Sequence, residues 1–191
     1  MTAEPLTRDR VLDAAEDTLR RFGPAKTTVV DVARALGVSH GTVYRHFASK
    51  AQLRDAVLER WLERMNPPLE AVALQDGPAG DRLRRWLLAL IGQKRRRARE
   101  DPDLFAAYAL LAQEARGVVV AHLAHMNRMV AAIVADGMAS GEFAAGDAEA
   151  TAAAVLDATT RFHHPAFAAQ WDDSAAFDPV WRLLLHGLAA R

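Results

Sequence analysis

The chain has 191 residues, 51% of them hydrophobic, and its 24 Lys and Arg residues balance 24 Asp and Glu residues, so its formal charge at pH 7 is zero. This apolar content supports a packed core and excludes a disordered chain, whereas the zero charge taken alone argues against a nucleic-acid binder. The absence of cysteine excludes disulfides, thiolate nucleophiles and cysteine-based zinc sites.

The charges are unevenly distributed along the chain. Residues 1–99 hold 19 Lys and Arg against 12 Asp and Glu, a net charge of +7, whereas residues 100–191 hold 5 against 12, a net charge of −7. This asymmetry indicates a basic functional region in the first half of the chain and an acidic second half.

Composition also indicates the fold class. Alanine occurs 40 times and isoleucine only twice, so helix formers abound and β-branched strand formers are scarce. We therefore expect an all-α protein. The start, MTAEPLTRDR, lacks the apolar core of a signal peptide, and no uninterrupted apolar run approaches the roughly 20 residues that a membrane-spanning helix needs. We expect a cytoplasmic protein that does not contact a membrane.

The first two helices are predicted from their apolar spacing and their end signals. Residues 8–22 place apolar side chains at helical intervals, with Thr7 as the N-cap and Gly23 at the end. A second helix begins at Thr28, where the hydroxyl of Thr28 and the carboxylate of Asp31 form an acidic variant of the capping box.

Two further helices follow closely. Gly37 ends the second helix, Ser39 caps a third helix over residues 40–47, and Ser49 with Gln52 caps a fourth that runs to about residue 65. A helix, a glycine turn and a second short helix have the spacing of a helix-turn-helix, which presents its second helix outward.

The third helix has two unlike faces. If Val43 and Phe47 point inward at i and i+4, polar or small side chains occupy the opposite side. That outward side carries Gly41, Thr42 and Arg45, with Tyr44 and His46 on its flanks.

The rest of the chain predicts a second helical domain. Asn66-Pro67-Pro68 indicates a break and residues 75–80 a linker, so we expect a helix-turn-helix domain at 1–65 and a second domain at 66–191. Further helices are predicted at about 81–99, 103–112, 114–139, 147–163 and 175–189, which gives about nine helices in total.

The segment from Thr27 to Leu53 has a specific pattern. It contains Gly37-Val38-Ser39, then Thr42-Val43-Tyr44, then His46-Phe47 and Ser49-Lys50. In order and spacing this pattern resembles the DNA-binding domain of the tetracycline-repressor (TetR) family of bacterial regulators. The resemblance covers residues 1–65 in detail and the remainder only by length and number of helices.

The resemblance implies a set of DNA contacts. The residues expected to contact DNA are Thr28, Ser39, His40, Gly41, Thr42, Tyr44, Arg45, His46 and Lys50. Arg45, Thr42 and His40 suit base edges, because Arg bridges the guanine acceptors and Thr hydrogen-bonds or touches a thymine methyl. The alternative is a helix-turn-helix used only for packing. Val30 departs from the pattern, since many relatives have a polar residue there that reaches DNA.

A run of cations extends from Lys94 to Arg99. One interpretation is that it stabilises the end of a helix before Asp101-Pro102. The other is that it adds long-range attraction to DNA phosphates.

Histidines raise the question of a metal site. His122, His125 and His163 would suit zinc if they met in space, but a pocket or core histidine is the more common case, and we predict no metal and no cofactor. The sequence has no Gly-rich phosphate loop, Gly-x-Ser-x-Gly or His-Glu-x-x-His motif, so we expect no enzymatic activity and no catalytic residues.

The second domain carries the expected effector and dimer residues. Aromatic and methionine side chains at helical spacing are either core or the lining of a pocket, and the family resemblance implies an inducer cavity for an apolar or aromatic compound. The candidate lining residues are Trp86, Phe105, Tyr108, His122, Met126, Phe162 and His163. Candidates for a homodimer interface, which are otherwise core, are Ala148, Ala152, Val155, Leu156, Thr159, Val180, Leu184, Gly187 and Leu188.

Together these patterns predict a homodimeric transcriptional regulator. We expect a repressor that binds a palindromic operator in the major groove of double-stranded DNA and is released by an unknown small molecule in its C-terminal domain. Two alternatives stay open: a ligand-independent DNA-binding dimer or activator, and a regulator that acts through a partner protein.

Overall fold

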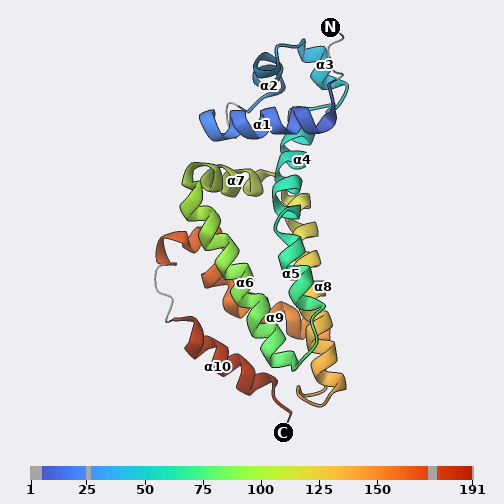
Figure 1. Cartoon of the computed structure of the whole chain (residues 1–191), viewed down its shortest axis with the longest axis vertical. Coiled ribbons are helices and arrows are strands. Elements are labelled where there is room, and N and C mark those ends of the chain that lie inside the picture. The colour runs from blue at the N-terminus through green and yellow to red at the C-terminus, as the bar shows by residue number, and fades with distance from the viewer. Residues whose placement is uncertain (1–5, 25–26, 172–175, 191) are drawn as a thin grey trace. The chain divides into compact units, whose positions relative to one another are not determined.

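The computed structural model describes residues 6–24, 27–171 and 176–190, and these residues form ten α-helices, a 3₁₀ helix and one isolated β-bridge. The all-α prediction is therefore confirmed. The helices are α1 (Arg8–Phe22), α2 (Val29–Leu36), α3 (His40–Tyr44), α4 (Lys50–Glu63), α5 (Asn66–Ala73), α6 (Ala79–Glu100), α7 (Pro102–Glu114), α8 (Arg116–Ala139), α9 (Ala148–His163), η2 (Pro165–Gln170) and α10 (Phe177–Leu188) (Figure 1).

The main departure from the predicted helices is α5. The sequence predicted a break at Asn66-Pro67-Pro68, but α5 begins there and carries both prolines in its first turn. Prolines are tolerated at that position because the N–H groups they lack would have no intrahelical partner. The expected start of the last helix at residue 175 lies outside the described residues, and α10 begins at Phe177.

The chain forms two compact units. Unit 1 comprises residues 1–64 and 101–120, and unit 2 comprises residues 65–100 and 121–191. Unit 1 thus contains α1 to α4 together with α7, although α7 follows α6 of unit 2 in the chain. The backbone passes from one unit to the other three times, after residues 64, 100 and 120.

Unit 1 is built around α1 and α4, which pack against each other and against α7. The indole of Trp61 on α4 stacks on the ring of Tyr108 on α7, with ring centroids 4.4 Å apart, and it meets Phe105 edge-on at 6.2 Å. The hydroxyl of Tyr108 donates to Oε1 of Glu16 on α1 at 2.7 Å. These aromatic and polar contacts join α7 to the helix-turn-helix.

Unit 2 has one apolar core shared by α5, α6, α8, α9 and α10. α6 contributes Leu83, Trp86, Leu87 and Leu90, while α8 contributes Val130, Ile133 and Val134. By length and composition alone α8 could cross a membrane, with a mean hydropathy of 1.5 in its most apolar window. The core helix of a soluble protein passes the same test, and 33% of that window is buried.

Gly137 on α8 permits the closest packing in unit 2. A Cβ atom at Gly137 would lie 2.3 Å from Cδ2 of Phe143 and 2.8 Å from Cβ of Ala79. Phe143 is itself buried and forms the isolated bridge with Ala189. The ring of Phe143 therefore packs where any larger residue at position 137 would place its side chain.

The variant Gly137→Ala is expected to be destabilised by about 1–3 kcal/mol, because the added methyl overpacks the core. The matched control is Gly92→Ala on α6, where a Cβ would meet no atom within 4 Å and alanine favours the helix by up to about 1 kcal/mol. Urea unfolding followed by circular dichroism measures both. Equal stability of the two variants would contradict this packing.

Candidate nucleic-acid interface

The turn between α2 and α3 is fixed by Gly37. Gly37 has φ of 66°, in the left-handed region that glycine adopts without strain. Its N–H donates to the carbonyl of Arg34, and the N–H of Val38 donates to the carbonyl of Ala33 at 3.0 Å. The turn thus satisfies the free carbonyl groups at the end of α2 and sets the direction of α3.

A side-chain cap begins each of the helices α2, α3 and α4, as predicted. The hydroxyl of Thr28 accepts from the N–H of Asp31 at 3.2 Å, and that of Ser39 accepts from the N–H of Thr42 at 3.2 Å. Ser49 accepts from the N–H of Gln52 at 3.1 Å, while the side chain of Gln52 accepts from the N–H of Ala48 in return. These caps satisfy N–H groups in the first turn of each helix, which have no intrahelical partner.

The carboxyl of Asp31 reinforces the first of these caps. The pKa of Asp31 is lowered, chiefly by the hydrogen bond from the hydroxyl of Thr28; burial opposes this shift, and the charge of Arg34 adds to it. A lowered pKa means that this carboxylate stabilises the fold at neutral pH and that its contribution is lost as the pH falls through the folded-state pKa.

Two side chains lock α3 in place: Val43 on its inner face and Phe47 beyond its end, because α3 ends at Tyr44 and not at residue 47 as predicted. Val43 and Phe47 are both 0% exposed, as their spacing predicted. The guanidinium of Arg8 lies 4.3 Å from the centre of the Phe47 ring, in a cation–π contact, and it also donates to the carbonyl of His46. These contacts fix α3 against the rest of unit 1.

The outer face of α3 is polar and open. Ser39, His40, Gly41, Tyr44 and Arg45 are exposed, whereas Thr28, Thr42, His46 and Lys50 are half-buried. The rings of His40 and Tyr44 meet edge-on at 6.4 Å. Hydrogen-bond donors and acceptors thus surround a glycine on one accessible surface, which is the arrangement a groove-reading helix requires.

Two family models match the chain. The model of bacterial regulatory proteins of the tetR family matches residues 11–57, and the model of the tetracyclin repressor-like C-terminal domain matches residues 79–181, more than half of the chain. The chain belongs to the tetracycline-repressor (TetR) family.

Individual TetR-type proteins give the same result. TtgR of Pseudomonas putida, a transcriptional regulator, is 42% identical over 53 residues, which are 28% of this chain and 25% of TtgR. A transcriptional repressor of Mycobacterium tuberculosis is 47% identical over 49 residues, 26% of each chain. The matches therefore span about a quarter of these relatives. Bacillus subtilis FadR, solved with stearoyl-CoA, shares the fold with a TM-score of 0.67 at 19% identity, covering 95% of this chain and 100% of that one.

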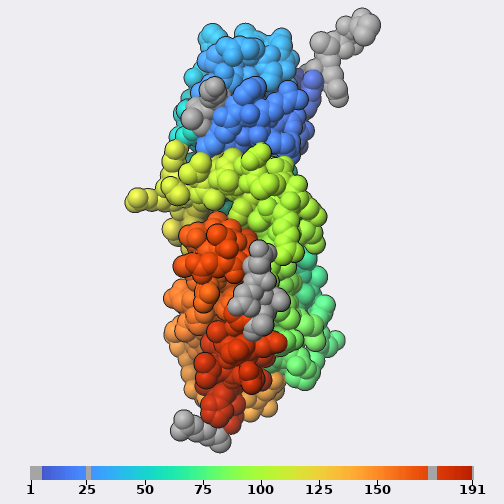
Figure 2. Space-filling model, turned by 90° about the vertical axis from the view of Figure 1, so that its left-hand side faces the viewer, coloured from blue at the N-terminus to red at the C-terminus, as the bar shows by residue number. Residues whose placement is uncertain are grey.

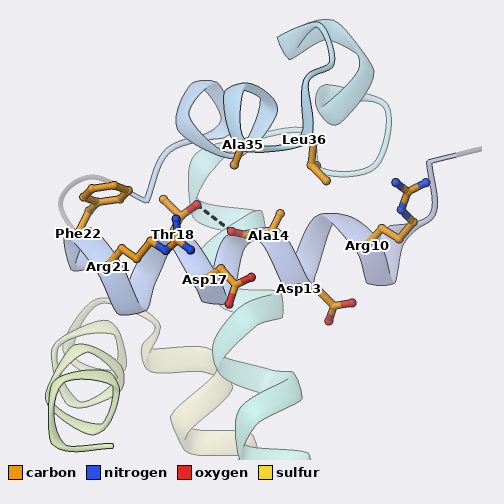
Figure 3. A pocket seen from close by; sticks show the side chains of 9 residues that line it. All are labelled: Arg10, Asp13, Ala14, Asp17, Thr18, Arg21, Phe22, Ala35 and Leu36. Atoms are coloured by element: carbon orange, nitrogen blue, oxygen red, sulfur yellow. Dashed lines mark hydrogen bonds between the residues drawn. The ribbon is translucent and has the colours of Figure 1, made fainter.

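A groove on unit 1 of this TetR-family chain lies between α1 and α2 (Figure 3). Two arginines, Arg10 and Arg21, and two aspartates, Asp13 and Asp17, line it together with Phe22, Ala35 and Leu36. The aspartates form ion pairs at 2.9 Å with Arg60 and Arg20. The groove therefore has a mixed lining of two arginines and two aspartates that are already paired with other arginines.

The cation run at the end of α6 is only partly available to solvent. Lys94 is buried, whereas Arg96 is exposed and lies 4.0 Å from Glu100, one helical turn along. The run is therefore not a uniform basic surface, because its first cation belongs to the interior of unit 2.

The candidate effector residues fall in different units. Trp86, His122, Met126, Phe162 and His163 lie in unit 2. Phe105 and Tyr108 lie in unit 1, against Trp61. The pKa of Tyr108 is raised, chiefly by burial and then by its hydrogen bond to Glu16. The rings of Phe105 and Tyr108 therefore pack against the helices of unit 1.

The three histidines considered for zinc do not form a metal cluster. Within residues 6–24, 27–171 and 176–190, no group of three or more His, Asp or Glu side chains is arranged to hold a metal ion. Nε2 of His125 lies 3.0 Å from Oε1 of Glu70 on α5, and Nε2 of His163 lies 3.4 Å from the hydroxyl of Thr159.

The candidate dimer residues need correction on α9. Ala152, Val155 and Thr159 are buried in the core of unit 2, so these side chains cannot meet a second copy. The exposed small residues of α9 are instead Ala150, Ala153, Ala154 and Ala158. The candidates Ala148 and Leu156 on α9 are half-buried. α10 lies at the surface of unit 2 (Figure 2), and on it Gly187 is exposed while Val180, Leu184 and Leu188 are half-buried. Leu183 on the same helix is 75% exposed.

The variant Tyr108→Phe tests the structural role of Tyr108. Removing the hydroxyl deletes one hydrogen bond to the Glu16 carboxylate and leaves the stacking on Trp61 intact, so we expect a loss of about 1–3 kcal/mol in the free energy of unfolding. Tyr44→Phe removes an exposed hydroxyl and is the control, with no expected change. Chemical denaturation compares the two, and equal stabilities would contradict the role assigned to Tyr108.

Proposed function

We propose that the protein is a transcriptional repressor that binds operator DNA as a homodimer and is released by a small-molecule effector. The observation that carries this proposal is the surface of α3, where an open polar face lies over the fully buried Val43 and Phe47. The match of residues 11–57 to the tetR regulatory model and the repressor among the relatives support it.

The proposed DNA contacts divide by chemistry. Arg45, Thr42 and His40 lie on or beside the exposed face of α3 and are assigned to base edges, because a guanidinium pairs with two guanine acceptors and a hydroxyl suits several bases. Tyr44 and Lys50 are assigned to phosphates, as a hydroxyl and a point charge. Phosphate contacts set the register, and base contacts provide specificity.

The capping residues have a second role in this proposal. Thr28, Ser39 and His46 lie at the edges of the α3 surface and are assigned to the DNA backbone. The hydroxyls of Thr28 and Ser39 already cap α2 and α3, so they hold the helix ends at the phosphates. Val30 on α2 is 49% exposed and apolar, so the proposed interface receives no hydrogen bond from that side chain.

A dimer gives this short helix enough specificity. Two copies of α3 placed about 34–36 Å apart would read both halves of a palindrome. The proposed dimer surface combines the exposed alanines of α9 with Leu183 and Gly187 on α10, because small residues allow two helices to approach closely.

The effector is proposed to bind in unit 2. Trp86, Met126 and Phe162 share its apolar core, and His122 and His163 are the remaining candidate lining residues. A fold relative, FadR, was solved with stearoyl-CoA, which supports a small-molecule effector. The effector shifts the population of DNA-binding dimers only by its differential affinity for the two states, and its effect reaches unit 1 through the three chain crossings.

The double variant Thr42→Ala with Arg45→Ala is expected to lose at least tenfold in affinity for the operator, since each good base contact contributes about 1–3 kcal/mol. DNA fragments retained by the wild-type protein from a random-sequence library supply the operator, and fluorescence anisotropy measures affinity. The control is Arg128→Ala on α8, an exposed arginine of unit 2. Unchanged affinity of the double variant would refute the assigned surface.

The variant Gly41→Ala separates folding from DNA binding. A Cβ at Gly41 would have one neighbour within 4 Å, the hydroxyl of Ser39 at 3.8 Å, so the fold accommodates it and the helix gains up to about 1 kcal/mol. At the groove the extra methyl keeps the backbone away from DNA. We expect unchanged or higher thermal stability with weaker operator binding. Unimpaired binding would show that α3 does not approach DNA through this face.

A further inference from the structure

The interior of unit 2 contains polar side chains that its apolar core does not explain. Gln93 and Lys94 on α6 are 6% and 7% exposed, and they lie two turns beyond Trp86 on the same face of the helix. His163 on α9 is buried as well, and His122 on α8 is half-buried. Polar groups from three helices are thus enclosed in one unit.

These groups influence one another electrostatically. Burial, followed by the charge of Lys94, lowers the pKa of both His122 and His163 to about 4. Burial, followed by the charge of Arg97, lowers the pKa of Lys94 to about 8. Lys94 therefore lies within electrostatic range of both imidazoles, and at neutral pH the group carries one ammonium and two neutral rings that can each donate a hydrogen bond.

Further titratable groups face these side chains. His125 on α8 contributes to the lowered pKa of His122, and His164 after α9 contributes to that of His163. Oε1 of Glu70 on α5 lies 3.0 Å from Nε2 of His125.

Three of the buried nitrogens in this group have no hydrogen-bond partner within the described part of the chain. They are Nε1 of Trp86, Nε2 of Gln93 and Nε2 of His122. Trp86 is 0% exposed, and its indole nitrogen can only donate. Buried polar atoms are usually hydrogen-bonded in native proteins, so these three nitrogens are available to a bound group.

We propose that unit 2 binds an effector with a carboxylate at one end and an apolar body. The carboxylate accepts hydrogen bonds from Lys94, Gln93 and His122, while the apolar body packs on Met126 and Phe162. This inference rests on the proposed function, because it names the chemistry of the same effector. It changes the sequence-based expectation of a purely apolar or aromatic compound.

A carboxylate fits this site better than a neutral carbonyl group. It offers two oxygens and about four lone pairs to several donors at once. A hydrogen bond between an ammonium and a carboxylate is also stronger than one between neutral groups, and more so away from water. The bound anion would restore the usual preference of Lys94 for its charged form.

The test compares acids with their neutral amides. Butanoate, octanoate, dodecanoate, benzoate and phenylacetate, each beside its amide, are titrated into the purified dimer without DNA, with thermal shift and calorimetry as readouts. We expect at least one acid to raise the melting temperature and to bind at least tenfold more tightly than its amide. If no acid in the series binds more tightly than its amide, the inference is wrong.

Variants locate the binding at the proposed site. Lys94→Met and Gln93→Leu are expected to weaken binding of that acid at least tenfold and to leave binding of the amide unchanged. Arg96→Met, two residues along α6 but exposed, is the matched control and retains the wild-type affinity. Circular dichroism melting of each ligand-free variant confirms folding. Wild-type affinity of folded Lys94→Met or Gln93→Leu for the acid overturns the inference.

DNA binding in the same preparations distinguishes this inference from the proposed function. If a non-acidic compound releases the operator while no acid binds, the proposed function stands and the carboxylate site fails. If an acid binds through Lys94 while the ligand-free protein retains no DNA fragment, the carboxylate site stands and the proposed repressor function fails.

Discussion

The burial of Val43 and Phe47 is the constraint on which the DNA-facing surface depends. A helix of five residues has no stability of its own, because nucleation costs more than so few backbone bonds return. α3 therefore exists only because these two side chains are buried, Ser39 caps its start and Arg8 lies over Phe47. The same burial turns Gly41 and Arg45 outward, so the core of unit 1 and its polar surface have a single cause.

The packing of α7 determines which part of the chain moves with the helix-turn-helix. Glu16 accepts from the hydroxyl of Tyr108 and also pairs with Arg64, while Arg54 pairs with Glu114 at the end of α7. These contacts tie α7 to α1 and α4. In the proposed function, a ligand in unit 2 acts on a body that includes α7 as well as the helix-turn-helix, and the backbone passes between the two units three times.

Local signals made the first four helices predictable from sequence, and tertiary packing made other features unpredictable. Capping depends on residues three positions apart, so Thr28, Ser39 and Ser49 could be assigned directly. The start of α5 was missed because a Pro-Pro pair is typical of both a break and a first helical turn. On α9, alanines occupy every face, so periodicity could not distinguish its core side, where Ala152 lies, from its surface. Burial of Lys94 was hidden because a run of cations normally indicates a solvated face.

Many cations in the basic first half of the chain are paired with acids and are therefore not available to DNA phosphates. In unit 1 the arginines at positions 20, 34, 54, 60 and 64 pair with acids, and these cations are neutralised before any phosphate approaches. Among the described residues no ion pair involves Arg45 or Lys50, which lie beside α3 and remain available. Since the salt dependence of DNA binding counts only cations that displace counterions from phosphates, few charges contribute to it. In the proposed function, affinity for DNA then depends on the placement of α3 by Val43 and Phe47 more than on the net charge of +7 over residues 1–99.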